Sequence, residues 1–250
     1  MIKCIAYRSW NEFKRDFTKD LFFDGIYKKD TYIFRGQGEE KWKLTSFFQR
    51  AFGQAIPWDK REEVENGLLS SFKEKCQRYV EDSRLEHLEG EELRILAQHY
   101  NVPTTLLDWS YSPYIAAFFA FSQCFNTNES NNVAIWAINR SHQIWCDKRG
   151  AEIVDDLVLV NKRQRWQQGC FTKIEYSENT VDDYALDRKR KNPEINLDEA
   201  IVKITIPKTE RLQALAELEA MNITYPAIMG GLESCGYAAI LDVQMKYFNN

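Results

Sequence analysis

The chain has 250 residues, 44% of them hydrophobic and 28% charged, which is enough for one large domain or two small ones. The net charge of −4 argues against a general nucleic-acid-binding surface. No apolar run approaches the ~20 residues of a membrane-spanning helix, and the N-terminal stretch has no apolar core of signal-peptide length.

Apolar patterning predicts a mixture of strands and helices in the first half of the chain. Strands are expected at residues 2–7, 31–35 and 104–107. Helices are expected at residues 9–21, 60–82, 90–100 and 113–124. Ser9 and Glu12 form a capping box for the first helix, and Ser112 caps the last one. Apolar residues at steps of four predict one buried face for helix 60–82: Val64, Leu68, Phe72, Cys76 and Val80.

The second half predicts strands at residues 133–138, 170–174 and 201–206, a helix at 208–222 and a Gly-rich helix or turn at 230–239. Residues 176–199 are polar and are expected to form an exposed excursion. Strands and helices alternate without a regular βαβ rhythm, which favours an α+β fold. We therefore expect a single domain over residues 1–250, with a mixed twisted sheet flanked by helices and helix 113–124 packed across one face.

The cysteines and histidines give no sign of a metal site. Six cysteines are scattered without a Cys-x-x-Cys pair, and the three histidines are dispersed at His87, His99 and His142. The cysteine spacing is also unpersuasive as a disulfide framework. We expect a reduced, cytoplasmic protein with no metal and no membrane contact, and the sequence leaves its oligomeric state open.

Arg35 stands at the end of the predicted strand 31–35 and is followed by Gly36 and Gly38. An arginine presents a planar, permanently charged fork that grips phosphate or carboxylate through two hydrogen bonds. The alternative is a structural arginine that pairs with Asp108 or with a helix C-terminus. Both interpretations remain open from the sequence.

Polar residues also cluster around the predicted strand 104–107. Asp108 and Ser110 follow it and present either ligand-binding groups or an ordinary strand end. His99 precedes it and either contacts a ligand as an acid, base or hydrogen-bond partner near neutral pH or caps its helix.

Three segments together resemble the FRG domain family, which is named for a Phe/Tyr-Arg-Gly signature. They are residues 34–37 (FRGQ), residues 97–120 (AQHYNVPTTLLDWS and its continuation) and residues 163–172 (RQRWQQGCFT). The resemblance extends from about residue 6 to residue 244 and implies one FRG-like domain. It implies no particular reaction.

In outline the chain is also similar to arginine-type ADP-ribosyltransferases. In those enzymes an arginine anchors NAD, and a hydroxyl at a strand end positions the nicotinamide ribose. This resemblance implies an ADP-ribosyltransferase-like fold with NAD as substrate. It implies Arg35, Gln37 and Ser110 as NAD-binding residues.

With this resemblance in view, we take Asp108, Gln167 and His99 as the candidate catalytic residues, although Asp108 has no equivalent in the transferases. A glutamate of these transferases stabilises the positive charge that develops as nicotinamide leaves. Here Gln167 and Gln168 occupy the corresponding segment, and a glutamine cannot supply negative charge. Asp108 or Glu175 would have to take that role.

Two classes of function follow. The first is an enzyme that transfers ADP-ribose to a macromolecule such as a protein or nucleic acid, or that hydrolyses NAD, in a bacterial or phage setting. The alternative is a non-catalytic module that binds a nucleotide or RNA in a bacterial or phage defence context. A purely structural interaction domain would leave Arg35, Asp108 and Gln167 without a role at their polar turns.

Overall fold

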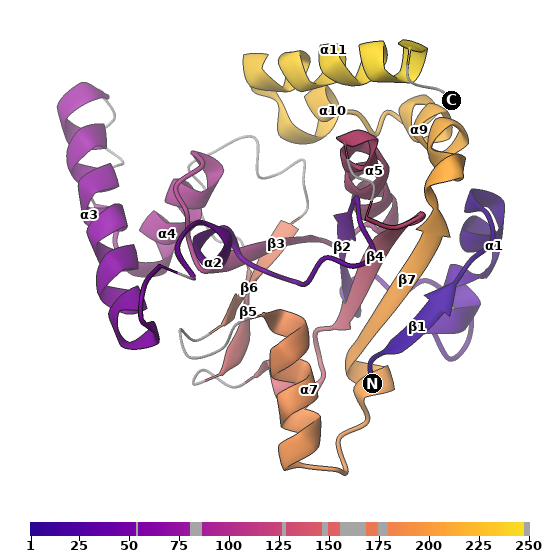
Figure 1. Cartoon of the computed structure of the whole chain (residues 1–250), viewed down its shortest axis with the longest axis horizontal. Helices are drawn as coiled ribbons and strands as arrows, with labels where there is room; N and C mark the ends of the chain where they lie inside the picture. The colour runs from indigo at the N-terminus through magenta and orange to yellow at the C-terminus, as the bar shows by residue number, and fades with distance from the viewer. Residues whose placement is uncertain are drawn as a thin grey trace.

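A seven-stranded mixed sheet lies at the centre of the fold, with its strands in the order β1-β7-β4-β2-β3-β6-β5 (Figure 1). In this computed structural model the described residues are 1–53, 55–80, 87–126, 129–146, 150–155, 169–174 and 180–247. The strands are β1 (Lys3–Ala6), β2 (Tyr32–Gln37), β3 (Leu106–Ser110), β4 (Asn132–Asn139), β5 (Ala151–Asp155), β6 (Gly169–Ile174) and β7 (Ile201–Pro207). β1 pairs with β7 in parallel and the other neighbours are antiparallel. The predicted α+β fold with one mixed sheet is confirmed.

Helices cover the sheet and one of its ends (Figure 1). They are α1 (Trp10–Leu21), α2 (Phe47–Phe52), α3 (Arg61–Tyr79), α4 (Gly90–His99), α5 (Pro113–Gln123), α7 (Val181–Lys191), α8 (Leu197–Ala200), α9 (Arg211–Ala220), α10 (Tyr225–Met229) and α11 (Gly231–Tyr247). Within the described ranges, no helix combines the length and the apolar character needed to cross a membrane.

The two faces of the sheet have separate cores, because alternate residues of β4 point to opposite sides. Val133, Ile135 and Ala137 pack with α5, α1 and α9, and the predicted burial of α5 is confirmed. Ala134, Trp136 and Ile138 belong to the opposite core with α7 and α8. Figure 1 shows α2, α3 and α4 grouped beyond the β3 side of the sheet.

β2 continues two residues beyond its predicted end at Arg35, so Arg35 lies inside the strand. Gly36 and Gln37 pair with Ile135 and Ala134 of β4. Gly36 does not end the strand. It allows α5 to pack closely against β2, because a Cβ at this position would lie 1.8 Å from the carbonyl oxygen of Ala116 on α5.

β3 is displaced along the sequence from its predicted position at 104–107. It begins at Leu106 and ends at Ser110, so Asp108 lies within the strand and pairs with Phe171. The residues before it are occupied otherwise: Thr104 Oγ1 accepts from Leu106 N, and Thr105 N donates to Glu65. Side-chain partners thus hold the two threonines outside the strand.

The predicted buried face of α3 is wrong by one position around the helix. Its buried residues are Arg61, Glu65 and Leu69, whereas the predicted stripe is half-buried and Val80 is 50% exposed. The charged side chains of Arg61 and Glu65 have internal partners, and spacing of apolar residues alone does not reveal that.

The predicted exposed excursion at 176–199 is also wrong for the residues described there. α7 buries Val181, Tyr184 and Ala185, and Tyr184 donates a 3.0 Å hydrogen bond to the carbonyl of Ile144. β5 was not predicted. Strands 170–174 and 201–206 and the helix at 208–222 are confirmed, and α11 is longer than the predicted segment at 230–239.

Candidate functional site

A cavity of about 320 Å³ lies beside the junction of β2 and β3. Among the described residues, pairing between these strands is confined to Phe34 and Ser110, whereas β2 pairs with β4 along its whole length. The polar residues that line the cavity include Arg35, Arg50, Gln98, His99, Asp108 and Ser110. The rings of Phe47, Trp109 and Phe119 also line it.

Arg35 bridges the two strands at this junction. Its Nη1 donates a 2.8 Å hydrogen bond to the carbonyl oxygen of Asp108 and lies 3.7 Å from Asp108 Oδ2. About 20% of the side chain is exposed, and Nε is buried with no hydrogen-bond partner among the described residues. Burial lowers the pKa of Arg35, the nearby Arg50 lowers it further, and the charge of Asp108 opposes both.

Arg50 is a second cation in the cavity that sequence reasoning missed. Its Nη1 donates to the carbonyl of Thr45 at 2.5 Å, and its guanidinium lies 5.7 Å from the ring centre of Phe47. Burial lowers the pKa of Arg50, and Asp108 opposes that shift. No local sequence signal marks this arginine, because its place depends on where α2 docks.

Asp108 is oriented by Gln98. The Asp108 side chain is 56% exposed, and its Oδ2 accepts a 3.0 Å hydrogen bond from Gln98 Nε2. Thr104 Oγ1 donates to Gln98 Oε1 at 2.5 Å, which fixes the amide so that its NH₂ faces the carboxylate. The sequence contained Gln98 within a family segment, but its role as a hydrogen-bond partner was not predicted.

Two further residues singled out from the sequence line the same cavity. The ring of His99 meets Phe171 edge-on, with centroids 6.1 Å apart. Ser110 is buried, and its Oγ accepts from Ser112 N at 3.1 Å. The structure therefore brings Arg35, His99, Asp108 and Ser110 together.

Two of the proposed site residues are not among these four. Gln37 is buried within the sheet, where Nε2 donates to the Lys43 carbonyl at 3.0 Å and Oε1 accepts from Trp136 Nε1 at 2.8 Å. Gln37 does not belong to the residues that line the cavity. Gln167, with Gln168 and Glu175, lies outside the described residues.

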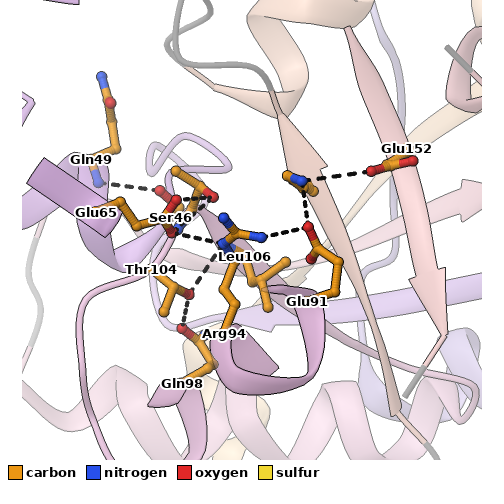
Figure 2. Close-up of polar contacts among 11 residues, drawn as sticks. Ser46, Gln49, Glu65, Glu91, Arg94, Gln98, Thr104, Leu106 and Glu152 are labelled. Atoms are coloured by element: carbon orange, nitrogen blue, oxygen red, sulfur yellow. Dashed lines mark hydrogen bonds and ion pairs between the residues drawn. The ribbon is translucent and has the colours of Figure 1, made fainter. Parts of the chain in front are cut away.

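A polar network fastens α3 and α4 to the sheet (Figure 2). Glu65 is fully buried and accepts from Thr105 N at 2.7 Å, and Arg94 Nε lies 3.3 Å from its Oε1. Figure 2 shows Arg94 between Glu65 and Glu91, with which it also pairs. Lys173 of β6 extends the network to Glu91 at 2.5 Å. This network fixes the helix that carries both Gln98 and His99.

The charges of the cavity favour an anionic ligand. Two guanidinium groups line it, and Asp108 is the one carboxylate among the described lining residues. Arginine recognises phosphate through paired hydrogen bonds, and aromatic walls suit a planar ring. The carboxylate is also placed where it can stabilise positive charge on a bound ligand.

Comparison with known proteins gives a family match for part of the chain. Residues 30–129 match the family model of the FRG domain, and this range includes β2, α2 to α5 and every lining residue named above. Searches of curated proteins and of solved structures gave no match. The chain therefore carries a match to the FRG domain over residues 30–129.

Proposed function

We propose that this protein binds NAD in the cavity beside β2 and β3 and cleaves the bond between nicotinamide and ribose, as ADP-ribosyltransferases do. The observation that supports the proposal is the convergence of Arg35, Asp108 and Ser110 on one cavity that also holds aromatic rings. The volume of about 320 Å³ lies at the lower end of ligand pockets, so it would enclose one nucleotide half of NAD.

Each residue has a role set by its chemistry. Arg35 would bind phosphate, since the residue lines the cavity and a guanidinium has further N–H groups besides the Nη1 that donates to Asp108. The Ser110 hydroxyl would contact the ribose, and the aromatic rings would hold the nicotinamide. Asp108 would face the ribose and stabilise positive charge there.

In the reaction the bond between ribose C1′ and the nicotinamide nitrogen breaks, and its electron pair leaves with nicotinamide. C1′ is left with oxocarbenium character, which the Asp108 carboxylate stabilises while Gln98 holds that carboxylate in place. A hydroxyl or amine of a macromolecule, or a water molecule, then adds to C1′ and loses its proton. His99, which lines the cavity, would accept this proton.

The test is to incubate the purified protein with NAD and to follow free nicotinamide by chromatography. We expect nicotinamide release by the wild type and at least a 100-fold loss in Asp108→Asn, since general electrostatic contributions of this type are worth about 10²–10³ in rate. Arg15→Ala, an exposed change on α1, serves as the control and should retain activity. Absence of nicotinamide release, with and without added protein and RNA acceptors, would overturn the catalytic proposal.

A second candidate is a module that binds a nucleotide or RNA without turnover. The observation that favours it is that Asp108 is already engaged by Gln98 and lies beside Arg35. The α10 segment contributes Met229 to the cavity and no carboxylate. Stabilisation of the protein by nucleotides in thermal-shift measurements, without release of nicotinamide, would support this candidate.

A further inference from the structure

Arg50 lies on a helix whose position is fixed by three hydrogen bonds to other parts of the chain. Phe48 N donates to the carbonyl of Thr104 at 3.0 Å. Arg61 of α3 donates to the carbonyl of Gly53 at 2.8 Å and to Gln49 Oε1 at 3.3 Å. The capping contact of Ser46 with Gln49 is visible in Figure 2. Arg50 is exposed, but the hydrogen bonds that position α2 hold it beside the cavity.

The two guanidiniums of the cavity are anchored in the same way. Arg35 and Arg50 each use Nη1 to donate to a backbone carbonyl, of Asp108 and of Thr45 respectively. A guanidinium has five N–H groups, so each arginine keeps others for a ligand. The buried Nε of Arg35 has no hydrogen-bond partner among the described residues. Each fork can therefore bind an oxyanion while its anchor stays in place.

The described residues that line the cavity carry more positive than negative charge. Asp108 acts electrostatically on both arginines, and each arginine is also partly desolvated. One carboxylate cannot neutralise two guanidiniums, and Arg50 disfavours the charged form of Arg35. A ligand with two charged groups joined at short range would satisfy both.

From this arrangement we infer that the cavity recognises a diphosphate, with Arg35 contacting one phosphate and Arg50 the other. The inference rests on the proposed nucleotide site and specifies its ligand class: a nucleoside diphosphate, or the diphosphate bridge of a dinucleotide. Arg50 is the residue that distinguishes two linked phosphates from one.

Calorimetric titration with AMP and ADP at fixed ionic strength tests this inference, because neither ligand contains nicotinamide. We expect the wild type to bind ADP at least 10-fold more tightly than AMP. Arg50→Ala should reduce this ratio to about 2-fold or less with AMP affinity nearly unchanged, and Arg50→Lys should restore part of it. Arg35→Ala should weaken both ligands.

Arg15→Ala is the matched control, because it removes one exposed arginine and the same net charge away from the cavity. It should leave both affinities unchanged, and melting temperatures should confirm that every variant is folded. Equal binding of AMP and ADP by the wild type, no binding of either, or an unchanged ratio in Arg50→Ala would overturn the inference. Preference for ADP without cleavage of NAD would instead refute the catalytic proposal and leave the diphosphate site standing.

Discussion

Arg35 on β2 donates a 2.8 Å hydrogen bond to the backbone carbonyl of Asp108 on β3. A side chain thereby extends the contact between two strands whose described backbone pairing is confined to Phe34 and Ser110. The geometry is compatible with both interpretations of Arg35, a structural arginine and a ligand-binding one, because the residue contacts Asp108 and also lines a cavity. Its structural and ligand-binding contributions can be separated by substitution.

Arg35→Lys should weaken nucleotide binding at least 10-fold, because a lysine cannot reproduce the two-pronged contact of a guanidinium with phosphate. The cost in stability should be about 1.5–3 kcal/mol, the net value of one hydrogen bond to a charged group. Urea denaturation and ligand titration on the same preparations measure both effects. A large loss of stability with unchanged affinity per folded molecule would mean that Arg35 only joins the strands.

Gly36→Ala should destabilise the fold by about 3 kcal/mol or more, at or above the upper end of overpacking effects. The new Cβ would lie 1.8 Å from the Ala116 carbonyl oxygen, so α5 would have to move away from β2. Gly67→Ala is the control: nothing lies within 4 Å of its Cβ, and an alanine within α3 should stabilise by about 0.5–1 kcal/mol. Equal urea midpoints for the two variants would contradict this prediction.

Arg94→Met should lower the free energy of unfolding by about 3–5 kcal/mol, because it removes the guanidinium that pairs with the buried carboxylate of Glu65. Glu65→Gln combined with Arg94→Met removes both charges and should recover a large part of the loss. A double-mutant cycle measured by chemical denaturation gives the coupling. Additive effects of the two substitutions would show that the pair is not energetically coupled.

Glu91→Gln should reduce stability at neutral pH but not in acid. Burial alone would raise the pKa of Glu91, but the hydrogen bond from Lys173 and the charge of Arg94 outweigh burial and lower it. A carboxylate with a lowered pKa in the folded state stabilises the protein above its unfolded pKa of about 4.3, and this contribution disappears as the pH falls through the folded value.

Urea denaturation of wild type and Glu91→Gln at about pH 7, 4.5 and 3 should therefore show a difference in the free energy of unfolding that disappears on acidification. Glu63→Gln removes an exposed carboxylate of α3 that pairs with Lys60, and it should give a small gap throughout. A Glu91→Gln gap that stays constant with pH would mean that charge is not the source of its effect.

The elements that could be predicted from the sequence are those whose apolar residues are continuous. Strand β4 and helix α5 are apolar along nearly their whole length, so the sequence indicates that they are buried whether helical or strand periodicity is assumed. α7 was missed because its buried apolar residues Val181, Tyr184 and Ala185 stand among charged ones, and Asp182 is itself buried, where it accepts a hydrogen bond from Leu44 N. Three apolar residues are too short a pattern to outweigh such charges.

The cavity was predictable only in part, for a related reason. Arg35, Asp108 and Ser110 could be predicted because they lie in recognisable sequence motifs, and the sheet places them together. Arg50 and Gln98 depend on tertiary contacts: α2 docks through Phe48 N, and Gln98 turns toward Asp108 because Thr104 holds its amide. No local periodicity encodes either contact.

The parallel pairing of β1 with β7 has a consequence for synthesis. Lys3 pairs with Val202 and Ala6 with Thr205, so β1 leaves the ribosome long before its partner strand. The hydrogen bonds of Trp10 also depend on later residues, because its backbone and indole N–H groups donate to Glu210 and Glu217. Contacts of such long sequence separation form late and slow folding. β1 therefore cannot pair until β7 has been synthesised, and a nascent chain that stops before β7 would expose the unpaired segment to chaperones and proteases.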